Sequence, residues 1–409
     1  MRRTRVVATI GPSSWDSGNL ESIFNAGADV FRLNYSHGEP EDKTELYKKI
    51  RSLETSQKTT CILADLPGPK LRLGEFNGVK LLNNGDSVRL VCGVLKHDGD
   101  EIPVEYEGLS AELRAGDKIL LADGLIRLSV MKTAEERGSF IDCIVEDGGP
   151  VTSRKGVNLP GTTIDLPAIG EKDKQALDHA LKSGADWVAV SYVRNAEDLR
   201  PAKEAIKAAG LHTPIIAKIE HPAALENLHS ILDVADGVMV ARGDLGVEIP
   251  LEQVPLAQQR IIDAGLMRGM VVIVATQMLE SMTLNPRPTR AEVSDVSTAI
   301  RHGGTAVMLS GETASGNHPV ASVETMVKIA NATEAGLVTS GGKPGALVKF
   351  RSTRAVAHAG VELSKIASAR HILVATQHGN APRLVAGYKP DVVVTAVTDR
   401  IRAARRMNL

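Results

Sequence analysis

Aromatic residues, net charge and long apolar runs are all scarce in this sequence. Aromatic side chains make up 3% of its 409 residues, too few for surfaces that stack nucleic-acid bases. The formal net charge is −1, so no overall electrostatic field would attract nucleic acid or an anionic membrane. No apolar run approaches the length of a membrane-spanning helix. We therefore expect a protein with no nucleic-acid partner and no membrane partner.

Cysteine is also rare. Cys61, Cys92 and Cys143 are far apart and form no pair with metal-ligand spacing. The first eleven residues are basic but contain no apolar core long enough for a signal peptide. Free thiols without a signal peptide are typical of a cytoplasmic protein, which is the localisation we expect.

Two common nucleotide-binding motifs are missing as well. The sequence contains neither GxxxxGK[ST] nor GxGxxG, so a bound nucleotide would need another device. The start of a helix at residues 36–38 (SHG) could hold a phosphate group. His37 could equally be a solvent-exposed residue at the start of that helix.

What the sequence does contain is a repeated strand–helix pattern. Short runs of β-branched residues bounded by turn signals predict buried strands. Eight such runs, each followed by a helical stretch, lie at 4–10, 28–34, 60–66, 186–193, 214–219, 236–241, 270–276 and 305–310. The predicted helices include 171–183, 221–233 and 290–301, the last opened by a Thr289–Glu292 capping box. Eight strand–helix units are the count of a TIM barrel, an α/β fold.

The pattern is interrupted once and is followed by a smaller unit. Residues 69–166 show short strands with turn signals and little helical periodicity, which predicts an inserted β-barrel or sandwich. A loose linker at 338–350 precedes two further strand–helix steps at 371–376 and 392–397, an α/β domain that looks incomplete. The expected divisions are barrel segments 1–68 and 167–337, an insert 69–166 and a C-terminal domain 338–409.

One basic cluster lies near the C-terminus. It consists of Arg400, Arg402, Arg405 and Arg406. We interpret it as the solvated face of a short helix, which is the usual role of such a run of charges.

The clearest chemical signal lies in residues 214–250. One predicted strand ends in Lys218 and Glu220, and the next is followed by Asp244 at the same end of a parallel sheet. Two carboxylates and an amine that meet there suit a divalent cation with a cationic partner. The alternative is a pair of exposed strand ends joined by salt bridges.

Polar residues also lie at or just beyond the carboxyl ends of the predicted strands. They are Thr9, Arg32, Asn34, Ser36, Asp65, Arg242, Thr276, Gln277, Ser310 and Glu312. Exposed strand ends are generally polar, but that explains less well why acids suited to Mg²⁺ accompany Arg32 and Lys218, whose charges suit a phosphoryl group. Gly243 and Gly246 would let the backbone approach an anion closely. The residues alone therefore indicate Mg²⁺-dependent chemistry on a small phosphorylated or carboxylated substrate.

Several long motifs carry a resemblance to a known family. RVVATIGPSS, FRLNYSHG, KGVNLPG, IIAKIE, MVARGDLGVEIP, ATQMLESM, PRPTRAEVSDV and MLSGETASG resemble the pyruvate kinase family, in that family's order. The resemblance covers the chain to about residue 335 and the remainder more loosely. It implies a TIM-barrel A domain, a β-barrel lid and an α/β C domain. It also implies transfer of the phosphoryl group of phosphoenolpyruvate to ADP, giving pyruvate and ATP at the last step of glycolysis.

The resemblance further implies a role for each matching residue. Lys218 and Arg32 would contact the transferring phosphoryl group, and Glu220 and Asp244 would hold Mg²⁺ or Mn²⁺. Gly243, Asp244 and Thr276 match positions that hold the substrate carboxylate, and Thr276 would organise proton delivery through water. The remaining assignments are Ser310 and Glu312 near the proton path, and Asn34, Ser36, His37, Arg72 and Lys155 on the nucleotide side. Family habit also suggests a homotetramer with residues 285–295 at one interface.

The sequence departs from the family pattern at two places. The potassium site uses positions matching Asn34, Ser36, Asp65 and Leu66, where potassium-dependent members have threonine at the last position and glutamate four residues later. Here these residues are Leu66 and Lys70, so an ammonium near Asp65 could replace the ion, and we expect no K⁺ requirement. The alternative is that Lys70 points to solvent.

The second departure is the C-terminal domain, which usually continues beyond the position of Leu409. Two other functions stay open at this point. One is a Mg²⁺-dependent lyase or aldolase acting on a pyruvate-like substrate, and the other is an inactive shortened form.

Overall fold

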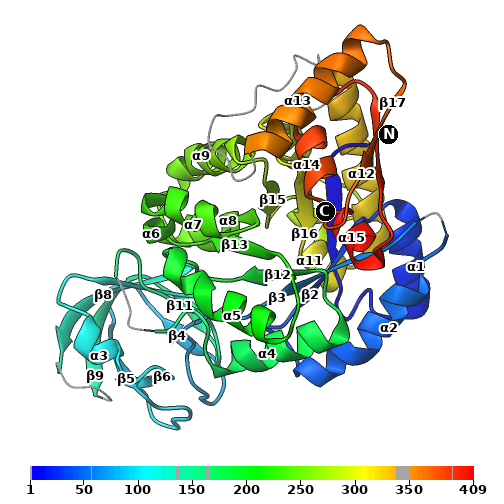
Figure 1. Cartoon of the computed structure of the whole chain (residues 1–409). Helices are drawn as coiled ribbons and strands as arrows, with labels where there is room; N and C mark the ends of the chain where they lie inside the picture. Colours follow the sequence, from blue (N-terminus) through cyan, green and yellow to red (C-terminus); the bar gives the residue numbers. More distant parts are fainter. Residues whose placement is uncertain are drawn as a thin grey trace.

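The computed structural model describes residues 2–56, 58–122, 124–134, 139–162, 166–337, 351–388 and 390–409. The linker that we predicted at 338–350 lies outside these residues. Figure 1 shows a central barrel with the insert and the C-terminal elements on opposite sides of it. None of the described helices is both long and apolar enough to cross a membrane.

The barrel is closed by eight parallel strands, which confirms the predicted fold class. Around the barrel the strand order is β1-β16-β15-β14-β13-β12-β3-β2. The strands are β1 Arg5–Thr9, β2 Val30–Asn34, β3 Cys61–Asp65, β12 Trp187–Val190, β13 Ile215–Ile219, β14 Gly237–Ala241, β15 Val271–Ala275 and β16 Ala306–Leu309. Nearly all their residues are buried, because helices cover the outside and side chains such as Leu63, Ile216 and Ile273 fill the inside.

The outer layer consists mainly of the helices that join successive strands. They are α1 Ser17–Ala26, α2 Thr44–Ser52, α4 Glu171–Ser183, α5 Arg200–Ala208, α6 Pro222–Glu226, α7 Leu228–Val234, α9 Val254–Met267, α10 Arg290–Arg301 and α12 Pro319–Gly336. The Thr289–Glu292 capping box opens α10 as predicted. The single helix predicted over 221–233 is wrong, because Asn227 leaves helical geometry (ψ +13°) and separates α6 from α7.

The insert folds as a separate β unit with its own apolar core. Its elements are β4 Lys80–Leu82, β5 Ser87–Cys92, β6 Ile102–Val104, α3 Leu109–Glu112, β7 Lys118–Leu121, β8 Ile126–Thr133, β9 Phe140–Asp147, β10 Gly149–Val151 and β11 Val157–Asn158. Six of the strands form a sheet in the order β11-β7-β8-β9-β5-β6. The preceding segment joins both edges of this sheet, because Arg72 bridges to Gly156 and Leu73 to Val104.

The C-terminal part packs on the amino-terminal end of the barrel. It contains α13 Arg351–Ile366, β17 His371–Ala375, α14 Asn380–Gly387, β18 Val393–Val397 and α15 Ile401–Arg406, with β17 parallel to β18. The indole nitrogen of Trp187, the first residue of β12, donates to the carbonyl oxygen of Arg406 at 3.2 Å. Asn408 donates to Thr59, which precedes β3. The insert adjoins the opposite, carboxyl end of the barrel, where Asn158 donates to Glu248 and to the Tyr192 hydroxyl.

The interpretation of the basic cluster as a solvated helix face is wrong for two of its four residues. Arg405 donates from Nε and Nη2 to the two carboxylate oxygens of Glu54, at 2.8 and 2.6 Å. Arg406 is partly buried, and this burial lowers the pKa of its guanidinium. Arg400 and Arg402 are exposed as expected. Arg405 therefore joins α15 to the barrel, and Arg406 is not part of a solvated face.

We predict that Arg405→Ala lowers the free energy of unfolding by about 1–2 kcal/mol, because it leaves the partly buried Glu54 carboxylate without its bidentate partner. Urea unfolding followed by tryptophan fluorescence measures this, since Trp15 and Trp187 both belong to the barrel segments. The control is Arg402→Ala, an exposed residue of the same helix, for which we expect a change within about 0.5 kcal/mol. Equal effects of the two substitutions would contradict the assignment.

Candidate active site

Asp65 lies at the centre of a buried cluster of charges at the carboxyl end of the barrel. It ends β3, and its side chain is 1% exposed. Its Oδ2 accepts a hydrogen bond from Arg32 Nε at 2.6 Å, and its Oδ1 lies 3.3 Å from Lys218 Nζ. Burial alone would raise the pKa of this carboxyl, but the charges of Lys218 and Arg32 outweigh burial and hold the pKa below its usual value. Asp65 is therefore ionised and orients both cations.

The Lys218 ammonium is held by three groups. Besides Asp65, it lies 2.9 Å from Glu220 Oε1 and donates to Ser191 Oγ at 2.7 Å. Ser191 in turn donates to the carbonyl oxygen of Leu66 at 2.8 Å. Burial would lower the pKa of Lys218, but the carboxylates of Asp65 and Glu220 prevail and raise the pKa above its usual value. The lysine thus supplies a permanent and oriented positive charge.

Glu220 and Asp244 follow the neighbouring strands β13 and β14. Glu220 is almost fully buried, and its Oε2 accepts from the backbone N–H of Tyr192 at 2.7 Å. Asp244 lies in the first turn of α8 Arg242–Glu248, which directly continues β14, and its side chain is 28% exposed. Burial raises the pKa of Glu220, and the charge of Asp244 adds to this rise against the opposing charge of Lys218. The two carboxylates are therefore close enough to repel one another.

This arrangement fits a divalent cation. Mg²⁺ is commonly bound by one or two carboxylates and completes its shell with substrate oxygens and water. Within the described part of the chain, no group of three or more acidic, histidine or cysteine side chains could form a larger metal site. Glu220 and Asp244 are therefore the residues that would hold such an ion.

The residues expected at a potassium site also lie at this end of the barrel. Asn34, in register with Asp65, accepts from the backbone N–H of Ser36 at 3.0 Å. Leu66 is buried and uses its carbonyl oxygen to accept from Ser191. We expected Lys70 near Asp65, and its ammonium lies 3.5 Å from Asp244 Oδ1. The Lys70 side chain is partly buried, so it does not simply extend into solvent.

Thr276 and Gln277 form a strained turn directly after β15. Their φ angles are +68° and +53°, in the left-handed region that a β-branched residue such as threonine rarely adopts. Thr276 Oγ1 accepts from the backbone N–H of Gly243 at 2.7 Å and donates to the carbonyl oxygen of Ala275 at 2.6 Å. The turn therefore holds the Thr276 hydroxyl beside Gly243.

Arg242 stabilises this turn through hydrogen bonds to its backbone. Its Nη2 donates to the carbonyl oxygens of Thr276 and Gln277, at 2.8 and 3.2 Å. Its Nη1 forms an ion pair with Asp295 of α10 at 2.7 Å. The sequence placed Arg242 among the strand-end residues without a specific role, and the contacts identify it as a support for the strained turn.

Ser310 and Glu312 lie at the same end of the barrel after β16, where α11 Gly311–Ala314 begins. Glu312 is fully buried and accepts from the backbone N–H groups of Leu279 and Ser310, at 3.0 and 2.7 Å. It therefore ties the loop after β15 to the loop after β16. The Ser310 hydroxyl is buried and has no hydrogen-bond partner among the described residues.

The predicted nucleotide-side residues come from two parts of the chain. Asn34 ends β2, and Ser36 and His37 follow it. The pKa of His37 is lowered by partial burial and then by the charges of Arg72 and Arg32. Arg72 and Lys155 belong to the insert, where Arg72 donates to the carbonyl oxygen of Arg154 at 3.3 Å. Among the described residues, no hydrogen bond or ion pair joins either insert side chain to the cluster around Lys218.

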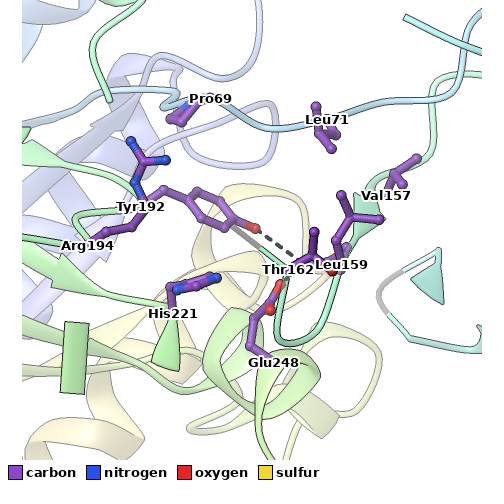
Figure 2. Close-up of a pocket in the computed structure, with 10 residues that line it drawn as sticks. Pro69, Leu71, Val157, Leu159, Thr162, Tyr192, Arg194, His221 and Glu248 are labelled. Carbon is purple, nitrogen blue, oxygen red and sulfur yellow. Dashed lines mark hydrogen bonds between the residues drawn. The ribbon is translucent and has the colours of Figure 1, made fainter. Parts of the chain in front are cut away.

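Sequence reasoning missed four residues of this region. Ser191 and Tyr192 follow β12 and contact Lys218 and Glu220, respectively. Asn158 of the insert and Glu248 of α8 line a small pocket between insert and barrel, together with Tyr192. Figure 2 shows the Tyr192 and Glu248 side chains pointing into this pocket, near Leu159 and Thr162. Ser191 could have been found from its place at a strand end, but the predicted strand 186–193 ran three residues too far.

Comparisons with known proteins point to one family. A family model described as pyruvate kinase, barrel domain, matches residues 1–323, and one described as pyruvate kinase, alpha/beta domain, matches residues 354–409. A pyruvate kinase of Methylorubrum extorquens is 42% identical over all of this chain and 85% of its own length. A pyruvate kinase of Mycobacterium tuberculosis is 39% identical over 97% of this chain and 84% of its own length. One of Geobacillus stearothermophilus is 40% identical over all of this chain and 70% of its own length.

We predict that Asp65→Asn destabilises the barrel by about 3 kcal/mol or more, because two buried cations lose their shared counter-charge. Urea unfolding followed by tryptophan fluorescence again measures the change. The matched control is Asp178→Asn, which removes an exposed ion pair with Lys182 on α4 and should cost less than about 1 kcal/mol. A loss in Asp65→Asn no greater than that of the control would show that the buried pairing contributes little to stability.

Proposed function

The chain belongs to the pyruvate kinase family, and we propose how its residues carry out that family's reaction. The reaction transfers the phosphoryl group of phosphoenolpyruvate to ADP and yields pyruvate and ATP, the last step of glycolysis. Phosphoryl transfer depends mainly on positioning and on stabilising the charge of the moving group. The observation that carries the proposal is the Lys218 ammonium, fixed by Asp65, Glu220 and Ser191 at the barrel end where the substrates would meet.

Lys218 and Arg32 form the phosphoryl-binding pair of this proposal. Both are oriented by Asp65, and the raised pKa of Lys218 keeps its ammonium charged at neutral pH. Cations that are fixed before the reaction need no reorganisation as charge develops on the transferring group. This arrangement favours the transition state over the bound substrate.

The family requires a divalent metal ion, and we propose Mg²⁺ or Mn²⁺ bound by Glu220 and Asp244. The bound ion would supply positive charge to the substrate oxygens as the enolate of pyruvate is released. Asp244 is the more exposed of the two carboxylates, which suits a ligand that faces the substrates. Lys70, at 3.5 Å, compensates the charge of Asp244 from the side of the insert.

In this proposal, Thr276 organises proton delivery to the enolate carbon. Its hydroxyl lies beside the backbone of Gly243, where we place the substrate carboxylate together with Asp244. The proton would pass through water, and the unpartnered Ser310 hydroxyl is a second group that could hold that water. Arg242 and Glu312 keep these hydroxyls in place through the backbone.

The nucleotide would bind between barrel and insert. Asn34, Ser36 and His37 contribute from the barrel, and Arg72 and Lys155 from the insert. Movement of the insert toward the barrel would bring its two cations to the phosphates and exclude water that could otherwise hydrolyse the phosphoryl group.

We also propose a homotetramer with residues 285–295 at one interface, in the cytoplasm. Exposed apolar residues support an interface here, since Val293 within this stretch is 36% exposed and Leu284 directly before it is 74% exposed. Cytoplasmic localisation is consistent with a glycolytic reaction and with three buried free cysteines.

One prediction from this proposal concerns Lys218. The parent chain should form pyruvate from phosphoenolpyruvate only when ADP and Mg²⁺ are present, and Lys218→Met should lower kcat by about 10²–10³-fold or more. Coupled assay of pyruvate formation measures both rates, and Lys182→Met, an exposed lysine of α4, is the control with unchanged activity. Turnover without ADP would contradict the reaction, and an unaffected Lys218→Met would contradict the role of the ammonium.

Another prediction from this proposal concerns the requirement for potassium. Turnover in potassium-free buffer should change less than about twofold on adding KCl, because Lys70 and the Lys218–Asp65–Arg32 cluster already provide positive charge at this site. The Leu66→Thr/Lys70→Glu double variant should instead become dependent on KCl, with NaCl at equal ionic strength as the control. Many-fold stimulation of the parent by KCl but not by NaCl would show that a potassium site survives.

A further inference from the structure

Asn158 is a residue of the insert that contacts two different elements of the barrel. It lies in β11, on the strand by which the chain returns from the insert, and the residue is 4% exposed. Its Nδ2 donates to Glu248 Oε1 at 3.0 Å and to the Tyr192 hydroxyl at 3.3 Å. Figure 2 shows Tyr192 and Glu248 converging on this part of the pocket from separate segments of the barrel.

Each of these two elements positions one of the proposed metal ligands. The backbone N–H of Tyr192 donates to Glu220 Oε2 at 2.7 Å. Glu248 is the last residue of α8, the short helix whose first turn carries Asp244. One amide of the insert is therefore connected to Glu220 through Tyr192 and to Asp244 through Glu248.

Neither element is held by its local conformation alone. Tyr192 has a φ of +52°, a left-handed conformation that is uncommon for a bulky residue and persists only where the surroundings enforce it. Helix α8 has only seven residues, too few to be stable without tertiary contacts. The hydrogen bonds from Asn158 reach both elements, so we expect them to restrain both.

The pocket offers few polar partners, so the contact between Asn158 and Glu248 is selective. Glu248 is 8% exposed, and its Oε2 and the Oδ1 of Asn158 are buried without partners among the described residues. Burial accordingly raises the pKa of Glu248. With so few polar partners nearby, loss of the Asn158 amide would leave Glu248 Oε1 without this donor in an apolar surrounding that includes Leu71 and Val157.

We propose that Asn158 is a positioning residue that couples the insert to the metal site. When the insert is seated, the Asn158 amide fixes Tyr192 and Glu248, and these fix Glu220 and Asp244 at the separation that a divalent ion requires. When the insert moves away, the two carboxylates lose this restraint. The proposal rests on the proposed function, since it takes Glu220 and Asp244 as the metal ligands.

The test is Mn²⁺ binding to the full chain, measured by calorimetry without substrates. Asn158→Asp should weaken Mn²⁺ binding about tenfold, as is usual when a residue that orients metal ligands is lost. The added negative charge alone would strengthen cation binding, so weakening reports lost geometry. Asn331→Asp on the exposed face of α12 carries the same charge change and should bind Mn²⁺ as the parent does.

A second variant tests whether the lost Mn²⁺ affinity can be restored. Asn158→Asp/Glu248→Gln restores an amide–carboxylate pair in reversed orientation with the net charge of the parent, and should recover Mn²⁺ affinity to within about threefold. In turnover assays, Asn158→Asp should raise the Mg²⁺ concentration for half-maximal activity while kcat at saturating Mg²⁺ changes less than about twofold. A purely structural defect would lower kcat and would not be rescued by metal.

Two results would overturn the proposal. They are parent-like Mn²⁺ affinity in Asn158→Asp, and failure of the double variant to bind more tightly than Asn158→Asp. If Asn158→Asp does not fold, Tyr192→Phe carries the test, with about threefold weaker binding expected and unchanged affinity overturning the coupling. Glu220→Gln separates the two levels, because unchanged Mn²⁺ binding in that variant would refute the ligand assignment of the proposed function itself.

Discussion

The pairing of the buried Asp65 carboxylate with Arg32 and Lys218 is the interaction on which the rest of the site depends. A carboxylate with 1% of its side chain exposed is stable only if cations replace the lost water, and Arg32 and Lys218 do so. The same pairing constrains the cations, because neither can turn away without leaving Asp65 uncompensated. Charge that stabilises the fold is thereby fixed where a phosphoryl group would need it. The structural demand on these three residues and the catalytic role that we propose for Arg32 and Lys218 are met by one arrangement.

The barrel makes this arrangement possible with contributions from distant parts of the sequence. Arg32, Asp65 and Lys218 come from β2, β3 and β13, and the parallel register places every carboxyl end at one rim. The opposite rim has a different task, since Arg405 and Trp187 there bind the C-terminal elements. Contacts at the amino-terminal rim therefore serve stability, and the carboxyl rim is left for substrates and the insert.

Much of this could be predicted from the sequence, because short β-branched runs and caps are local signals. The eight strands and the Thr289–Glu292 box were found from such signals. The break at Asn227 and the early end of β12 at Val190 were missed, since both depend on tertiary contacts rather than on hydrophobic period. The side-chain partners of Lys70 and Arg405 were also missed. A lysine or arginine can reach several acids, and only the folded chain shows which one is near.

Strain at the site is concentrated at Thr276, Gln277 and Tyr192, all three with positive φ. Such conformations cost on the order of 1–3 kcal/mol each, and each must be stabilised by contacts from outside its own segment. For the turn after β15 those contacts come from Arg242, itself braced by Asp295. For Tyr192 they come from Asn158 of the insert and from Glu220. The first support lies wholly within the barrel, so the Thr276 hydroxyl stays in place whatever the insert does. The second crosses to the insert, so the geometry around Glu220 depends on the insert's position.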